Sequence, residues 1–199
     1  MNSILRATTY NPDIHHRRSI RLKGYDYSRA GAYFITICTH GRECILGDLV
    51  DGEMRLNEYG DIARGEWLNL PNRYPDIELD AVVIMPNHIH AIIAIHAVGV
   101  IHELPLRNDT KHRRTMLIPK IVGYVKMNSA KRINQSRNTP GARIWQRNYH
   151  EHVIRDEADL ARIRKYVANN PRKWDTDREN PDNMEPRRHR PPQADDPGP

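Results

Sequence analysis

The sequence has little of several things that define common protein classes. Of its 199 residues only one is Phe and two are Cys, Cys38 and Cys44, so a core must be built from Ile, Val, Leu, Tyr and Trp. Two cysteines make neither a disulfide framework nor a zinc site of paired Cys. No apolar run has the length of a membrane span, and the first residues lack the apolar centre of a signal peptide. We therefore expect no membrane association and a reduced, cytoplasmic location.

Charge and proline content divide the chain into three parts. Lys and Arg outnumber Asp and Glu by 31 to 25, which gives a net charge of +6 and favours a polyanionic partner, although many ordinary proteins share such an excess. The first 23 residues are basic and lack periodicity. Residues 171–199 hold seven of the fourteen prolines and almost no apolar residue after Trp174. We predict a basic arm (1–23), one folded domain (24–170) and a disordered tail (171–199).

Hydrophobic periodicity predicts the elements of the folded domain. Apolar and β-branched runs indicate strands, and apolar residues at helix spacing indicate helices. The predicted strands cover residues 32–39, 77–84, 88–96 and a short stretch near 142–147, with a small hairpin at 44–56 around Asp51-Gly52. The predicted helices cover 57–70, 117–133 and the sequence from about 148 to 170. Apart from the hairpin, this order is β-α-β-β-α-β plus a terminal helix. It predicts an α/β (α+β) domain of ferredoxin-like architecture, an antiparallel sheet with two helices on one face.

The motif Asn87-His88-Ile89-His90 opens the predicted strand 88–96. Alternate side chains of a strand point to the same face, so His88 and His90 lie together while Ile89 points away. Two imidazoles in that arrangement can chelate one metal ion. The alternative is a pair of polar residues on a solvated sheet face.

A second motif, W-Q-R-N-Y-H-E-H, begins at Trp145, where a strand is expected to give way to a helix. Tyr149 and His152 are three residues apart and would share a helix face. Tyr149 can then act as a nucleophile and His152 can join the metal ion. The alternative is that Tyr149 is a core aromatic residue. The last helix is expected to cross the sheet face that the first two helices leave open, and so to bring Tyr149 to the histidines.

These motifs resemble those of a known family, the REP-associated tyrosine transposases, which belong to the HUH endonucleases with a single catalytic tyrosine. The resemblance rests on M-P-N-H-I-H, W-Q-R-N-Y, H-V-I-R and Y-V-A-N-N-P-x-K-W, and on R-R-S-I-R-L-K-G-Y-D-Y and G-A-Y-F-I-T-I-C-T near the start. It covers roughly residues 17–174.

The resemblance implies a mechanism and a set of site residues. Tyr149 is the expected nucleophile, and His88, His90 and His152 are the expected ligands of a divalent metal, Mg²⁺ or Mn²⁺, with Glu151 a weaker candidate for the third ligand. Ligand preference alone would also suit zinc. Attack on a phosphodiester would leave a 5′-phosphotyrosine and a free 3′-hydroxyl. The implied partner is single-stranded DNA beside short palindromic hairpins, which suggests a nucleoid-associated protein; the sequence leaves monomer and homodimer open.

Basic residues supply candidates for contacts with DNA phosphates. They are Arg17, Arg18, Arg21 and Lys23 of the arm, Lys111, Arg113 and Arg114 of a polar loop, Lys126, Lys131 and Arg132 of the second helix, and Arg147.

Two other functions remain open. A metal-dependent phosphodiesterase could activate water, with Tyr149 only positioning the substrate, and it would form no covalent adduct. A non-catalytic module could bind nucleic acid hairpins, but residues 88–96 lack the aromatic side chains that RNA-binding sheets use for stacking.

Overall fold

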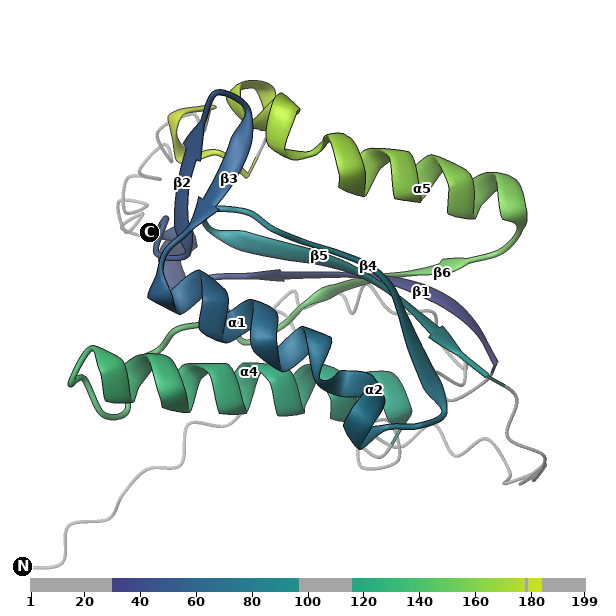
Figure 1. Ribbon diagram of the computed structural model, residues 1–199, viewed down its shortest axis with the longest axis horizontal. Coiled ribbons are helices and arrows are strands. Elements are labelled where there is room, and N and C mark those ends of the chain that lie inside the picture. Colours follow the sequence, from purple (N-terminus) through teal and green to yellow (C-terminus); the bar gives the residue numbers. More distant parts are fainter. Residues whose placement is uncertain (1–29, 97–115, 178, 184–199) are drawn as a thin grey trace, which may run out of the picture.

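The computed structural model describes residues 30–96, 116–177 and 179–183. Within these ranges the chain forms a four-stranded antiparallel sheet of order β4-β5-β1-β6 and a separate hairpin, β2-β3. The sheet strands are β1 (Gly31–Cys38), β4 (Ile77–Ile84), β5 (His88–Ile95) and β6 (His150–Ile154). Helices α1 (Glu58–Leu68), α2 (Leu70–Arg73) and α4 (Leu117–Ser136) cover one face, and α5 (Glu157–Asn169) crosses the other (Figure 1). The predicted ferredoxin-like arrangement with an additional helix is confirmed.

The two central strands separate two cores. On β1, Tyr33, Ile35 and Ile37 are fully buried against α1 and α4, whereas Phe34 packs in a smaller cluster under α5. Strand β5 has buried residues on both faces, as expected for a central strand with helices above and below. Any polar side chain on the α5 face of β5 is therefore withdrawn from water.

Local signals determine the hairpin and the first helix. Strands β2 (Gly47–Val50) and β3 (Glu53–Leu56) are joined by Asp51 and Gly52, both at positive φ, as a tight hairpin turn requires. The side chain of Asn57 then caps α1 by accepting hydrogen bonds from the backbone N–H groups of Tyr59 and Gly60.

The prediction for residues 142–170 is wrong in one respect. The last strand is β6, which begins at His150, and the helix starts only at Glu157; the stretch 142–147 forms a single bridge, between Trp145 and Thr39. Residues 150–154 pair with the edge of β1, in the register Thr36 opposite His150 to Ala32 opposite Ile154. This long-range pairing overrides helix spacing, and it removes Tyr149 and His152 from any helix.

The predicted tail boundary at residue 171 is also too early. Residues 171–177 and 179–183, here called the C-terminal segment, form the 3-10 turns η2 (Pro171–Thr176) and η3 (Pro181–Asn183) against the domain. Trp174 and Asn180 are buried, and the amide of Asn180 donates to the carbonyl of Trp174 at 3.1 Å. Polar side chains that satisfy the backbone take the place of an apolar core here, and composition alone did not reveal them.

The basic arm, the polar loop with Lys111, Arg113 and Arg114, and the chain after residue 183 lie outside the described residues. Among the helices that the structure describes, none is long and apolar enough to cross a membrane.

Candidate active site

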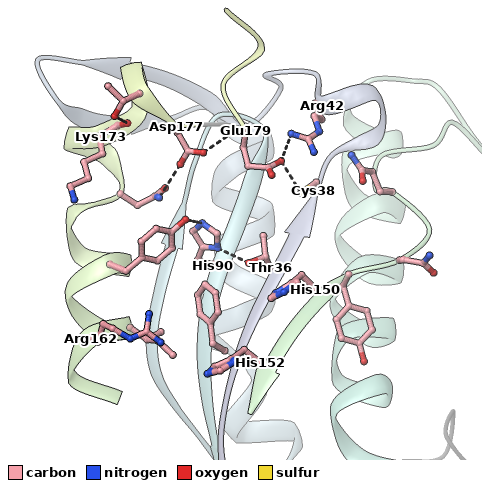
Figure 2. A pocket seen from close by; sticks show the side chains of 18 residues that line it. Thr36, Cys38, Arg42, His90, His150, His152, Arg162, Lys173, Asp177 and Glu179 are labelled. Atoms are coloured by element: carbon pink, nitrogen blue, oxygen red, sulfur yellow. Dashed lines mark hydrogen bonds and ion pairs between the residues drawn. The ribbon is translucent and has the colours of Figure 1, made fainter. Parts of the chain in front are cut away.

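Two histidines of β5 lie side by side on the sheet face that α5 covers, as strand alternation predicts. The ring centroids of His88 and His90 are 4.6 Å apart, and both side chains are buried. His90 borders a cavity of about 810 Å³ that is also lined by β1, β6, α5 and the C-terminal segment (Figure 2). The pair is therefore buried rather than on a solvated sheet face, and His90 forms part of the wall of a pocket.

The tyrosine that meets this pair is Tyr166 of α5. Its Oη lies 3.3 Å from Nε2 of His90, and the two ring centroids are 5.2 Å apart. On the other side of the imidazole, Nδ1 of His90 is 2.8 Å from Oγ1 of Thr36, and Phe34 contacts both rings. Tyr166 is nevertheless 43% exposed, and it lines the pocket together with His90.

Helix spacing aligns Tyr166 with a second polar residue. Ile163 and Val167 are buried against the sheet, and Tyr166 and Asn170 continue the same face at intervals of three and four residues. Asn170 is the C-cap of α5 and only 1% exposed. One helix face thus brings a phenol and an amide to the two imidazoles.

A hydrogen bond determines which ring nitrogen of His88 carries the proton and which has the lone pair. Its Nδ1 lies 2.8 Å from Oδ1 of Asn87, an oxygen that only accepts, so Nδ1 carries the proton and Nε2 has the lone pair. Among the described residues, Nε2 of His88 has no hydrogen-bond partner. Burial lowers the pKa of His88, against the opposing influence of Asp177, Glu179 and the Asn170 amide. The ring is thereby held neutral, with an unshared lone pair inside the protein.

Asn170 offers a matching oxygen. Its Nδ2 donates to Oδ2 of Asp177 at 3.1 Å, while its buried Oδ1 has no hydrogen-bond partner within the described part of the chain. The Asn170 side chain also acts on His88, where it opposes the effect of burial on the pKa, so the two residues are neighbours and a ligand bound between them would satisfy both acceptors. Since imidazole nitrogen and amide oxygen both bind divalent cations, the donors of His88, His90 and Asn170 fit a metal ion.

Tyr149, the predicted nucleophile, lies elsewhere. It precedes β6, with β1 between β6 and the strand of the histidines. Its ring packs against the core beneath α1 and α4, and its hydroxyl is buried, although part of the residue reaches the cavity wall. The structure therefore does not join Tyr149 to His88 and His90.

His152, the predicted third ligand, is engaged with α5 instead. It lies on β6 opposite Phe34, and its Nε2 is 2.8 Å from Oδ2 of Asp159. Hydrogen bonds from His152 and then Arg162 lower the pKa of Asp159 to about 2. Glu151, the weaker candidate, is opposite Ile35 and so belongs to the face of α1 and α4. Within the described residues, no three His, Cys, Asp or Glu side chains gather as a metal site.

The residues predicted to contact DNA differ in their surroundings. Lys126 is partly buried, which lowers its pKa to about 8, and its Nζ donates to the carbonyls of Gln146 and Asn148. It therefore anchors the segment before β6. Arg147 is exposed, and the remaining predicted contacts of the arm and the polar loop are outside the described residues. The pocket wall carries three basic residues that the sequence did not single out: Arg42, which pairs with Glu179, and Arg162 and Lys173.

A sequence signal for the site existed in the motif Y-V-A-N-N-P. Tyr166 and Asn170 are four residues apart and so share a helix face, as Tyr149 and His152 would if their segment were helical. What the sequence could not show is which of the two segments is helical.

Comparisons with known proteins give relatives in sequence and in structure. A protein of Haemophilus influenzae known only as an uncharacterized protein is 40% identical over 178 residues, which is 86% of this chain and 97% of that protein. A putative REP-associated tyrosine transposase of the same organism is 28% identical over 147 residues, 73% of each chain. No family model matches.

Two solved structures are also similar. One is a REP-associated tyrosine transposase bound to a REP hairpin, with 21% identity and a TM-score of 0.47 over 80% of this chain and 73% of that one. The other is a putative transposase from Deinococcus radiodurans, with 20% identity and a TM-score of 0.43 over 75% of this chain and 97% of that one.

Proposed function

We propose that this chain, which is 28% identical over 147 residues to a putative REP-associated tyrosine transposase, cleaves and rejoins single-stranded DNA beside palindromic hairpins. Tyr166 is the proposed nucleophile, in place of Tyr149. The observation that carries this proposal is the contact of Tyr166 Oη with His90 Nε2 at 3.3 Å, at the floor of the cavity.

His88, His90 and Asn170 are the proposed ligands of a divalent cation, Mg²⁺ or Mn²⁺. The two buried acceptors without partners among the described residues, Nε2 of His88 and Oδ1 of Asn170, support this choice. When bound, such an ion withdraws negative charge from a phosphate oxygen and so eases attack by an anionic nucleophile.

The chain's own residues supply the nucleophile and hold it in place. Ile163 and Val167 fix α5 on the sheet, and Phe34 and His90 flank the Tyr166 ring, so its oxygen needs little reorganisation before reaction. In the proposed step the Tyr166 oxygen bonds to phosphorus as the phenolic proton is lost. The bond from phosphorus to the 3′ oxygen breaks, and that oxygen leaves as a hydroxyl after taking up a proton. The 5′-phosphotyrosine conserves the ester for rejoining.

The pocket suits an unpaired strand. Tyr166 lines a cavity bordered by α5 and the sheet, and we propose that a strand free of its complement enters there. Arg162 and Lys173 on the cavity wall are proposed to bind the flanking phosphates. Arg147, which is exposed, is a further candidate.

The proposal is tested by trapping the covalent adduct. The protein is incubated with Mn²⁺ and labelled single-stranded hairpin DNA from its own genomic neighbourhood, and the products are separated on a denaturing gel. A protease-sensitive slow band, absent in His88→Ala, is expected, and mass spectrometry of its peptides should locate the nucleotide on Tyr166. Cleavage without any adduct would point to activated water. Binding without cleavage on every hairpin would point to a non-catalytic module.

A further inference from the structure

We infer that Asp177 in the C-terminal segment is a positioning residue, which holds the Asn170 side-chain oxygen toward His88. This inference rests on the proposed function. It makes a part of the chain outside the predicted domain necessary to the site.

The Asp177 carboxylate accepts two hydrogen bonds. Oδ1 of Asp177 accepts a hydrogen bond from the backbone N–H of Glu179 at 2.7 Å, and Oδ2 accepts from Nδ2 of Asn170 at 3.1 Å. A carboxylate has no proton to donate, so only the NH₂ end of Asn170 can face it. The Oδ1 end must then point the other way, toward His88, whose pKa the Asn170 side chain raises against the effect of burial.

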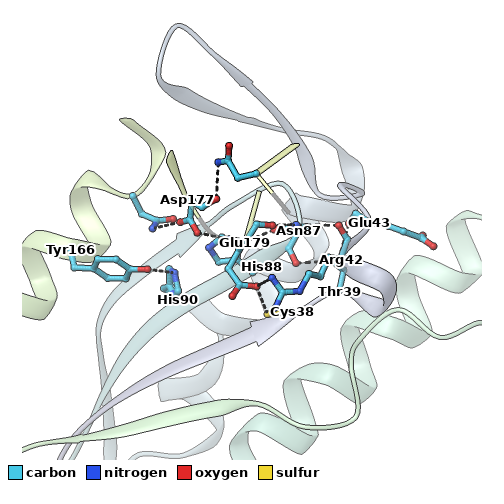
Figure 3. Close-up of polar contacts among 12 residues, drawn as sticks. Cys38, Thr39, Arg42, Glu43, Asn87, His88, His90, Tyr166, Asp177 and Glu179 are labelled. Atoms are coloured by element: carbon cyan, nitrogen blue, oxygen red, sulfur yellow. Dashed lines mark hydrogen bonds and ion pairs between the residues drawn. The ribbon is translucent and has the colours of Figure 1, made fainter. Parts of the chain in front are cut away.

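The same segment orients His88. Nδ2 of Asn87 donates to the backbone carbonyl of Glu179 at 2.7 Å and to that of Arg42 at 3.1 Å. With its NH₂ group so engaged, Asn87 must turn Oδ1 toward Nδ1 of His88, which keeps the lone pair on Nε2 (Figure 3). Asp177 and Glu179 thus help to fix the direction of both buried acceptors, Oδ1 of Asn170 and Nε2 of His88.

The segment is anchored well enough for this role. The Trp174 ring lies 5.9 Å from the His88 ring at an angle of 31°. The Glu179 carboxylate pairs with Arg42 at 2.5 Å and is 3.7 Å from the sulfur of Cys38 on β1. An element fixed at both sides of Asp177 can hold a carboxylate in one orientation.

The substitution Asp177→Asn tests the inference without changing side-chain shape. The amide oxygen is expected to keep the Glu179 N–H bond, which leaves an NH₂ group facing Asn170. Asn170 must then reverse and present its own NH₂ group to the cation. Mn²⁺ affinity, measured by titration calorimetry without DNA, is expected to fall on the order of 10- to 100-fold, as for other residues that orient metal ligands.

Two companion variants make the test specific. Asp175→Asn removes the same charge from an exposed position in the same segment and is expected to leave Mn²⁺ affinity within about twofold. In the double variant Asn170→Asp with Asp177→Asn, the new carboxylate accepts from the new amide and still offers an oxygen to the cation. Mn²⁺ binding is expected to return and to exceed that of Asn170→Asp alone, in which two carboxylates face each other, a difference that a merely structural role for Asp177 does not produce.

The outcomes separate the two proposals. If His88→Ala and Asn170→Ala bind Mn²⁺ like the unmodified protein, the proposed metal site is wrong, and the inference falls with it. If those two lose binding while Asp177→Asn retains it, or if the double variant stays as weak as the single one, only the positioning role is overturned. Melting curves of all variants ensure that folded proteins are compared.

Discussion

Replacing Tyr166 with Phe removes a single oxygen atom and leaves the ring contacts with Phe34 and His90 in place. The hydroxyl makes a long contact, 3.3 Å to His90 Nε2, in a side chain that is 43% exposed. A hydrogen bond of this kind contributes no more than about 1 kcal/mol to stability. The folded state of Tyr166→Phe should therefore be almost unchanged.

The effect of Tyr166→Phe on the cleavage rate should be much larger than its effect on stability. Loss of a covalent nucleophile typically lowers the rate by at least about 1,000-fold, which corresponds to about 4 kcal/mol of activation free energy. Tyr149→Phe should leave strand cleavage nearly intact, because Tyr149 precedes β6, on the far side of β1 from the strand of the histidines, and its ring packs in the core under α1 and α4.

The assay compares both variants with the unmodified protein. Single-turnover cleavage of labelled hairpin DNA with Mn²⁺ gives the rate, and urea unfolding gives the stability. Adduct formation by Tyr166→Phe at a normal rate would refute the assignment, and its loss in a fully folded Tyr149→Phe would return the role to Tyr149.

Three further predictions follow from the surroundings of the site. His152→Ala should change the Mn²⁺ affinity by less than about threefold, because Nε2 of His152 binds Asp159 and does not face the histidine pair. A loss of affinity as large as that of His88→Ala would contradict this prediction. The pKa of Asp159 is lowered to about 2, so its ionised form stabilises the fold fully above pH 3.8 and loses that effect as the pH falls toward 2. The difference in urea midpoint between the unmodified protein and Asp159→Asn should accordingly be smaller at pH 3 than at pH 6, and a constant difference would be inconsistent with the ion pair. Burial raises the pKa of the Cys38 thiol to about 11, so only about one part in a thousand of it is thiolate at pH 8. Iodoacetamide should therefore label the exposed Cys44 first. Equal labelling of the two cysteines, measured by mass spectrometry, would contradict the burial of Cys38.

The sequence by itself determined most of the elements and the position of the histidine pair. Strands 77–84 and 88–96 and the order of elements follow from local periodicity, and the structure agrees with them to within a residue. His88 and His90 share a face because a strand alternates, whatever surrounds it. These properties depend on neighbours two to four residues away.

Only the tertiary structure decided which tyrosine meets the histidines. Residues 150–154 pair with the free edge of β1 and become strand, so the helix starts later and carries Tyr166 rather than Tyr149 to the sheet. Tyr166 is 76 residues from His90, and Asn87 is 92 residues from Glu179. Contacts across such separations depend on strand pairing and on how α5 crosses the sheet, neither of which local spacing encodes. The same reason explains why the C-terminal segment, a tail by composition, borders the site in the folded protein.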